Sequence, residues 1–141
     1  EQLQMSLEKL LPWNHKYSVT YGEPYILYNF YHTEKSGYRA GTPGQSWRTA
    51  TAQCFIRTMI RYMYGLVPTM EGLRLEPCLP PDWEECSITK VFRECRYEIT
   101  YRQDGEGEGV LARILVNGEE TKDNLLPYES GKYYKIEVYL K

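Results

Sequence analysis

Features that identify a metal centre or a membrane span are scarce in this sequence. It has two histidines and four cysteines, and no C-x-x-C pair that would supply the ligand spacing of a zinc site. No apolar run is long enough to cross a membrane. We therefore expect no metal, no membrane partner and a cytoplasmic chain with reduced cysteines. Cys78 and Cys86, which flank a Pro-Pro loop, are the alternative: a pair that could form a disulfide.

An excess of charge of one sign is also lacking. The 17 Lys and Arg residues face 19 Asp and Glu residues, for a net charge of −2, which gives no electrostatic reason to expect a nucleic-acid partner. Phe and Trp occur three times each, whereas tyrosine occurs 14 times. Tyrosine suits half-wet surfaces because its ring packs while its hydroxyl stays hydrogen-bonded. Such a composition fits a carbohydrate-handling protein and, equally, any sheet-rich surface.

Two segments have the apolar spacing of helices. Residues 1–11 repeat leucine at helical intervals, and Pro12 ends the repeat. A second helix is expected to begin at Ser46, a good N-cap, and to stop at Gly65. Cys54 lies within it and is expected to pack. Its apolar stripe consists of Ala52, Phe55, Ile56, Met59, Ile60 and Met63.

After residue 70 the pattern changes to that of short strands. Apolar side chains alternate at 73–75, 97–101 and 134–140, which predicts strands with one buried face. The dipeptide at 117–118 is Asn-Gly, a strong hairpin signal. The acidic, glycine-rich stretch 103–109 is expected to be a solvated hairpin tip. The chain is thus predicted to be α+β, with N-terminal helices followed by a small antiparallel β-sandwich.

The second helix follows the loop "GTPGQSWRTATAQCF", which begins at Gly41. The first backbone N–H groups of a helix lack internal partners and carry the positive end of the helix dipole. With nearby glycines, a threonine hydroxyl and the charges of Arg39 and Arg48, such a start is suited to phosphate. From the spacing alone an ordinary capped helix remains the commoner explanation. The G-x-x-x-x-G-K-[ST] phosphate loop is absent.

No complete set of catalytic residues is evident. Glycoside chemistry needs a carboxyl group held beside the scissile bond, and the spacing singles out none. The isolated histidines and carboxylates considered were His15, His32, Glu23, Glu34, Glu71 and Glu76.

Three stretches resemble a known family. They are "PYILYNFYH" at 24–32, "GQSWRTATAQCFIRTMIRYMYGLVPTMEGLRLEPCLPPDW" at 44–83 and "ITKVFRECRYEI" at 88–99. They are similar to the C-terminal part of glycoside hydrolase family 94, which contains cellobiose, cellodextrin and chitobiose phosphorylases and cyclic β-1,2-glucan synthases. The match is close over 23–101, and its G-L-x-[IL]-x-P-C-[IL]-P-x-x-W run is specific to that family.

The resemblance implies a fold and a domain boundary. Members of the family have a catalytic (α/α)6 barrel followed by a C-terminal jelly-roll. Residues 1–66 would then be the end of the barrel, and 67–141 the jelly-roll-like β-sandwich. Because the chain begins without Met, inside what looks like a helix, we expect it to be part of a longer protein.

The resemblance also implies a reaction and a site. The family cleaves a β-glucoside with inorganic phosphate as co-substrate, without a cofactor and with inversion, and releases an α-sugar 1-phosphate. The family's phosphate-binding W-x-T-G pattern maps to Thr49 and to Ala50, which replaces the usual glycine. The general acid of the family lies upstream, so this chain alone is expected to be inactive. Residues that would line the sugar side are Tyr38, Arg39, Gln45 and Arg48.

Alternatives to this hypothesis remain. One is the phosphorylase-like part of a cyclic β-1,2-glucan synthase, and another is a stand-alone carbohydrate-binding or structural β-module. The expected partners are an oligosaccharide and phosphate. An apolar helix face at 47–64, left without a bundle to cover it, would favour a homodimer.

Overall fold

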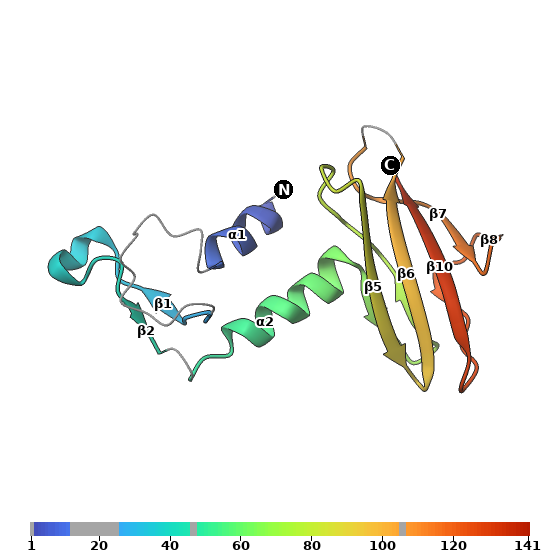
Figure 1. Cartoon of the computed structure of the whole chain (residues 1–141), viewed down its shortest axis with the longest axis horizontal. Helices are drawn as coiled ribbons and strands as arrows, with labels where there is room; N and C mark the ends of the chain where they lie inside the picture. Colours follow the sequence, from blue (N-terminus) through green and yellow to red (C-terminus); the bar gives the residue numbers. More distant parts are fainter. Residues whose placement is uncertain (1, 12–25, 46–47, 105–106) are drawn as a thin grey trace. The chain divides into compact units, whose positions relative to one another are not determined.

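The computed structural model describes residues 2–11, 26–45, 48–104 and 107–141 (Figure 1). The chain forms two compact units, Glu1–Arg57 and Thr58–Lys141. The domain boundary expected between residues 66 and 67 stays a prediction. No helix in the described ranges has both the length and the apolar character that crossing a bilayer requires. The expectation of an α+β fold is confirmed by the helices and the largely antiparallel sheets.

The N-terminal unit contains short elements. Helix α1, Gln2–Leu10, lies where the leucine spacing predicts a helix. Leu7 is buried, whereas Leu3 and Leu10 are exposed. Its other elements are β1 (Phe30–Tyr31), the 3-10 helix η2 (Glu34–Arg39), β2 (Pro43–Gly44) and α2, which begins at Thr51. Strands β1 and β2 pair antiparallel, with Phe30 opposite Gly44.

The second predicted helix consists of two helical segments in the structure. Helix α2 spans Thr51–Thr58, and a π-helical turn η3, Met59–Met63, follows it. The Ala50 carbonyl accepts the first helical hydrogen bond, from the Cys54 N–H at 2.9 Å. The predicted start at Ser46 lies outside the described residues. Gly65 ends the helical segment as expected, with φ of +68°.

The apolar stripe of this segment is only partly covered. Met63 is buried, whereas the Ile56 side chain is 56% exposed. Cys54 is exposed, so the expectation that it packs is wrong. It lies three residues before exposed Arg57, on the solvent side of α2.

The C-terminal unit consists of two sheets. The larger has the order β5-β6-β10-β7-β8, and the smaller the order β3-β4-β9. The strands of the larger sheet are β5 (Glu85–Phe92), β6 (Cys95–Gln103), β7 (Leu111–Val116), β8 (Glu119–Thr121) and β10 (Tyr133–Leu140). Those of the smaller sheet are β3 (Leu66–Pro68), β4 (Leu73–Leu75) and β9 (Leu125–Leu126).

The centre of the larger sheet is a parallel pair. Strand β10 runs parallel to β6, with Tyr134 opposite Tyr97 and Ile136 opposite Ile99, and antiparallel to β7. The expectation of a purely antiparallel sandwich is therefore wrong at this position. Because β10 separates β6 from β7, these two consecutive strands do not pair as a hairpin. The hairpin tip expected at 103–109 is therefore wrong for the described residues of that stretch, and residues 105–106 lie outside the described ranges. Gly109 packs there so closely that an added Cβ would lie 1.8 Å from the Leu79 carbonyl oxygen.

The core of this unit lies on the inner face of the larger sheet. The predicted alternation is confirmed, since Tyr97, Ile99 and Tyr101 are at most 1% exposed. The Tyr97 hydroxyl donates to the Pro127 carbonyl at 2.9 Å. This bond joins the inner face of β6 to the chain that follows β9, so the two sheets form two layers around one core.

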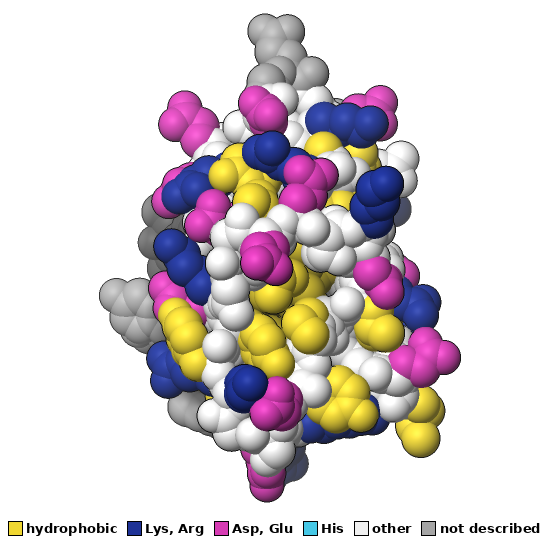
Figure 2. Space-filling model, turned by 90° about the vertical axis from the view of Figure 1, so that its right-hand side faces the viewer, with side chains coloured by type: hydrophobic (Ala, Val, Ile, Leu, Met, Phe, Trp, Pro, Cys, Tyr) yellow, Lys and Arg dark blue, Asp and Glu magenta, His cyan; other side chains and the backbone are white. Residues whose placement is uncertain are grey.

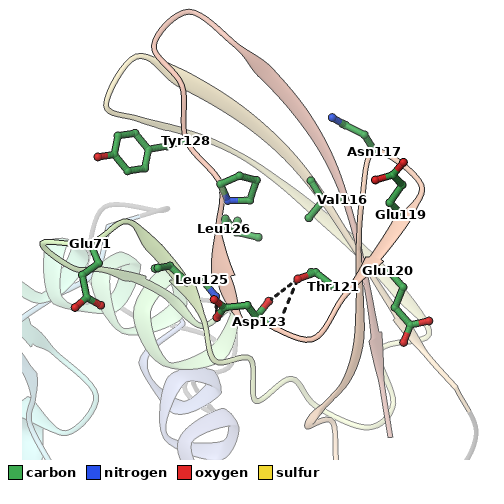
Figure 3. A pocket seen from close by; sticks show the side chains of 11 residues that line it. Glu71, Val116, Asn117, Glu119, Glu120, Thr121, Asp123, Leu125, Leu126 and Tyr128 are labelled. Carbon is green, nitrogen blue, oxygen red and sulfur yellow. Dashed lines mark hydrogen bonds between the residues drawn. The ribbon is translucent and has the colours of Figure 1, made fainter.

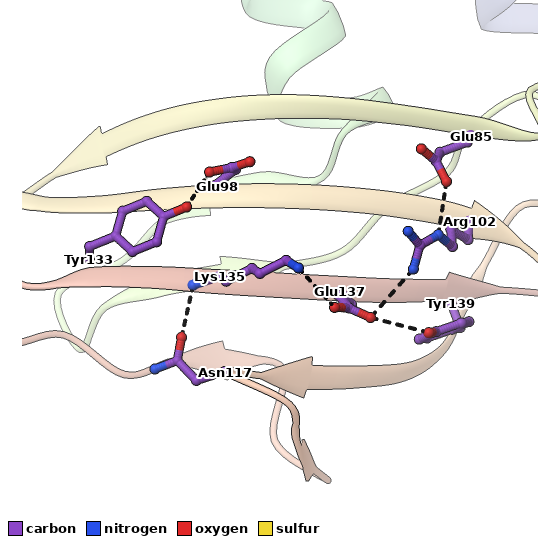
Figure 4. Close-up of polar contacts among 8 residues, drawn as sticks. All are labelled: Glu85, Glu98, Arg102, Asn117, Tyr133, Lys135, Glu137 and Tyr139. Carbon is purple, nitrogen blue, oxygen red and sulfur yellow. Dashed lines mark hydrogen bonds and ion pairs between the residues drawn. The ribbon is translucent and has the colours of Figure 1, made fainter.

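The outer face of the larger sheet carries polar side chains (Figure 4). Arg102 on β6 bridges Glu85 on β5 at 2.8 Å and Glu137 on β10 at 3.4 Å. Lys135 lies 3.6 Å from the other oxygen of Glu137. Basic and acidic side chains are also mixed on the face drawn in Figure 2, where hydrophobic side chains gather near the centre. These groups compensate one another's charge, which fits the small net charge.

Candidate functional site

The loop that leads to α2 is held by the short β1–β2 pair. The His32 N–H donates to the Thr42 carbonyl at 2.9 Å, and the Gly41 N–H donates back to the His32 carbonyl at 2.8 Å. Gly41 has φ of +78°, a conformation that glycine adopts without strain. These bonds fix the backbone that carries the predicted site residues.

Gly44 has a packing role within this loop. A Cβ built on Gly44 would lie 2.2 Å from the Phe30 ring, and that ring makes an edge contact with His32, with centroids 5.4 Å apart. The absence of a side chain at position 44 is therefore explained by the aromatic pair beside it. Close approach of a ligand is not needed to explain this glycine.

Gln45 is the last described residue before the gap at 46–47. It is exposed and has φ of +53°, which is uncommon for a residue with a side chain. Its amide oxygen accepts a hydrogen bond of 3.1 Å from the side-chain nitrogen of Asn29. Gln45 is thus oriented by the chain that precedes β1, a partner that the sequence did not indicate.

Tyr38 and Arg39 form a pair at the end of η2. The Arg39 Nε donates to the Tyr38 hydroxyl at 3.1 Å, and the guanidinium lies 5.4 Å from the centre of the tyrosine ring. Tyr38 is 88% exposed. The pair therefore presents an aromatic ring and a cation to solvent.

Thr49 and Ala50 form the entry to α2. The Thr49 Oγ1 accepts a 3.1 Å hydrogen bond from the Thr51 N–H and lies 2.6 Å from the Thr51 Oγ1. Ala50 is exposed, and Thr49 is half-buried. When the Thr51 hydroxyl is the donor of the short contact, the Thr49 proton is left to donate elsewhere. The geometry thus provides a hydroxyl donor beside the first turn of α2.

The structure brings the predicted site residues together only in part. Thr49 and Ala50 adjoin exposed Arg48 along the chain, and Tyr38 contacts Arg39. Among the described residues, no hydrogen bond or ion pair joins either arginine to Thr49. The predicted sugar-side residues Tyr38, Arg39 and Gln45 therefore have hydrogen-bond partners other than Thr49 and Ala50.

A second feature, which sequence reasoning missed, is a hollow in the C-terminal unit (Figure 3). Its volume is about 840 Å³. The sequence contains both of its sides, the Asn-Gly hairpin at 117–118 and Tyr128 after "LLP". Only the fold shows that these two segments lie together. The lining residues are Glu71, Val116, Asn117, Glu119, Glu120, Thr121, Asp123, Leu125, Leu126, Pro127 and Tyr128.

Comparison with curated proteins identifies several relatives, whereas no family model matches the chain. A solabiose phosphorylase of Paenibacillus borealis is 34% identical over 117 residues, which are 82% of this chain and 15% of that protein. The 3-O-β-D-glucopyranosyl-β-D-glucuronide phosphorylase of the same organism is 29% identical over 84% of this chain and 15% of its own length.

A third relative comes from another organism. The N,N'-diacetylchitobiose phosphorylase of Vibrio proteolyticus is 24% identical over 71% of this chain and 12% of its own length. The chain thus spans 12–15% of the length of these relatives. Each of the three is named as a phosphorylase, in agreement with the motifs quoted above. Over the residues that match these relatives, the chain is homologous to phosphorylases, and its resemblance to the C-terminal part of glycoside hydrolase family 94 is confirmed.

Proposed function

We propose that this chain is the C-terminal part of an inverting glycoside phosphorylase. The protein that carries it would cleave a β-linked glucodisaccharide or oligosaccharide with inorganic phosphate and release an α-sugar 1-phosphate. The observation that carries the proposal is the 34% identity to a solabiose phosphorylase over 82% of the chain. In this proposal residues 1–66 end the catalytic (α/α)6 barrel, and 67–141 form a jelly-roll-like domain.

The proposed reaction exchanges one bond for another at the anomeric carbon. A phosphate oxygen attacks that carbon as the glycosidic C–O bond breaks with inversion. The general acid donates a proton to the departing glycosidic oxygen. It regains a proton from the phosphate, so the protons balance and no cofactor is consumed. The general acid is proposed to lie outside these 141 residues, and the chain alone would therefore be inactive.

The entry to α2 would bind the phosphate. The Thr49 hydroxyl would donate to a phosphate oxygen while it accepts from the Thr51 N–H at 3.1 Å. The Ala50 N–H, at the positive end of the helix dipole, would provide a second donor. Exposed Arg48 would add a positive charge. The methyl group of Ala50 narrows this site relative to the glycine of the family pattern.

The sugar would lie on the side of the loop that carries Tyr38, Arg39 and Gln45. The exposed Tyr38 ring offers a surface for the apolar face of a sugar, and the Gln45 amide offers hydrogen bonds. We also propose that the exposed part of the α2 stripe, at Ile56, takes part in a homodimer. Sedimentation of wild type and Ile56→Lys would test that association.

The test is an assay of sugar 1-phosphate release with inorganic phosphate. The substrates are solabiose, 3-O-β-glucosyl glucuronide, N,N'-diacetylchitobiose, cellobiose, laminaribiose and β-1,2-glucan. The protein that carries this chain at its natural full length is compared with the 141-residue chain. Release by the full-length protein alone would support the proposal and identify the substrate class.

Two outcomes would contradict the proposal. Activity of the isolated chain would require one of its own carboxylates to be the general acid. If the full-length protein released no sugar 1-phosphate from any of the six substrates, phosphorolysis would be contradicted. Preferential cleavage of β-1,2-glucan would instead support the glucan-synthase alternative.

A further inference from the structure

The hollow in the C-terminal unit has an apolar floor beside a polar rim. The chain from Leu125 to Tyr128 forms one side, and the β7–β8 hairpin around Asn117 forms the other (Figure 3). Leu126 is buried at 1% exposure and Leu125 is half-buried. The volume of about 840 Å³ falls within the range typical of small-molecule sites.

Tyr128 is an exposed aromatic ring that the fold holds in place. It is 49% exposed. The Arg93 guanidinium lies 5.2 Å from its ring centre and 5.0 Å from that of Phe92. The same guanidinium donates to the carbonyl oxygens of Thr69 at 3.2 Å and Met70 at 2.9 Å. An arginine fixed by four contacts keeps the tyrosine ring ordered, which lowers the entropy cost of stacking a ligand on it.

The polar rim offers groups that suit sugar hydroxyls. The Asn117 Oδ1 accepts from the Lys135 N–H at 2.9 Å, so its amide NH₂ is oriented. Glu119 is exposed on β8 and lies opposite Val116, on the face of the hollow, and its carboxylate can accept hydrogen bonds from hydroxyls.

The charged side chains that line the hollow are all acidic, while Arg93 and Arg74 lie beside it. Its eleven lining residues include four carboxylates, of Glu71, Glu119, Glu120 and Asp123, and no Lys or Arg. Two of them have partners within the protein, since Glu71 pairs with Arg74 at 3.6 Å and Asp123 accepts from the Leu125 N–H at 2.9 Å. Anionic ligands would be repelled from this surface.

We propose that this hollow binds an uncharged oligosaccharide. The sugar would stack one apolar face on Tyr128 and donate a hydroxyl hydrogen bond to Glu119, which lies opposite Val116 on the same face, while the acidic rim disfavours sugar phosphates. The ring and the leucine floor distinguish this site from a cation site, which would need oxygen ligands alone. The proposal does not rest on the phosphorylase function, because every residue it uses lies in the unit Thr58–Lys141 and none of them belongs to the proposed phosphate site.

The experiment is a titration of the isotope-labelled 141-residue chain, in EDTA, followed by amide chemical shifts. The probes are cellotetraose, laminaritetraose and glucose 1-phosphate. A neutral tetrasaccharide is expected to shift the amides of Asn117, Glu119 and Tyr128 in a saturable way. Glucose 1-phosphate is expected to leave these three unchanged. Shifts it causes at Thr49–Thr51 would concern the phosphate proposal alone, so the two proposals fail separately.

Matched variants locate the site. Tyr128→Ala is expected to weaken tetrasaccharide binding roughly fivefold. The control is Tyr133→Ala, which removes an aromatic side chain of similar exposure, 51%, from the outer face of the larger sheet and is expected to leave binding unchanged. Glu119→Gln alters only an exposed carboxylate, so it tests the rim even if the Tyr128 variant is unfolded, and it should weaken binding about twofold.

Three results would overturn the proposal. The first is the absence of saturable shifts with both tetrasaccharides. The second is an equal loss of binding in Tyr128→Ala and Tyr133→Ala. The third is binding of glucose 1-phosphate in the hollow as tight as that of the neutral sugars.

Discussion

The Tyr101 hydroxyl donates a 2.7 Å hydrogen bond to the backbone carbonyl of Tyr64, the residue that follows the π-helical turn. Tyr101 is 1% exposed, so the bond is formed inside the core of the C-terminal unit. It joins the centre of the larger sheet to the chain that leaves the helical segment. A backbone carbonyl that would otherwise lack a partner at the helix end is thereby satisfied.

Removal of this hydroxyl should destabilise the unit. Tyr101→Phe leaves the Tyr64 carbonyl without its donor and is expected to lower the free energy of unfolding by about 1–2 kcal/mol. Urea unfolding followed by circular dichroism measures the difference. Tyr133→Phe is the control, because Tyr133 is half exposed. Equal losses in the two variants would show that the buried bond has no special role.

Stability should fall at high pH because of two buried tyrosines. Burial raises the pKa of Tyr101 and of Tyr97 above the usual value near 10. The folded state therefore keeps both neutral while the unfolded state ionises, so stability is fully present below pH of about 10 and decreases above it. The slope should reach up to about 1.4 kcal/mol per pH unit for each tyrosine.

The measurement is urea unfolding between neutral pH and the alkaline limit of the native state. A variant that carries Tyr97→Phe and Tyr101→Phe should have a flatter profile above pH of about 10. If the free energy of unfolding of this variant fell as steeply with pH as that of the wild type, groups other than these two tyrosines would cause the loss of stability.

Gly65 should tolerate no side chain. Its φ is +68°, and an added Cβ would lie 2.1 Å from the backbone carbonyl carbon of Glu76. Gly65→Ala is therefore expected to cost at least about 3 kcal/mol. Gly131→Ala is the matched control, since φ is +77° there but no atom lies within 4 Å of the added Cβ. It should cost only about 1 kcal/mol, and a comparable loss in both variants would contradict the steric explanation.

The cysteines should react with a thiol reagent at different rates. Burial, with the Glu85 carboxylate nearby, raises the pKa of the Cys86 thiol to about 11, so little thiolate is present at neutral pH. Cys54 and Cys78 are exposed, and Cys95 is buried. We expect Cys54 and Cys78 to react first in the native chain, and all four only after unfolding. Mass spectrometry of peptides after brief alkylation measures the order, and early labelling of Cys86 would contradict it.

The buried faces of the strands were predictable from sequence, but their neighbours were not. Alternation at Tyr97 and Ile99 on β6, and at Tyr134 and Ile136 on β10, predicted which side chains enter the core. Alternation reports only a strand's own two faces, so it contains no information on the parallel pairing of β6 with β10. The misassignment of 103–109 as a hairpin tip follows from the same limit.

The candidate site was predictable to a similar extent. The sequence predicted a helix start at Ser46, which lies outside the described residues, whereas α2 begins at Thr51, where the Thr49 hydroxyl accepts a hydrogen bond from the Thr51 N–H. The bond from Asn29 to Gln45 spans 16 residues, and local patterns do not reveal such contacts. The hollow beside Tyr128 was missed for the same reason, since its two sides are distant in sequence.

The central claim is that the entry to α2 binds the phosphate of a phosphorolysis reaction. Its most direct test is the KM for inorganic phosphate in the full-length protein that carries this chain, measured for wild type, Thr49→Val and the exposed control Thr89→Val. Loss of one hydrogen bond to a charged oxygen should raise the KM for phosphate in Thr49→Val by roughly tenfold or more, with little change in the KM for the sugar. The control should match the wild type. An unchanged KM for phosphate in Thr49→Val would contradict the account.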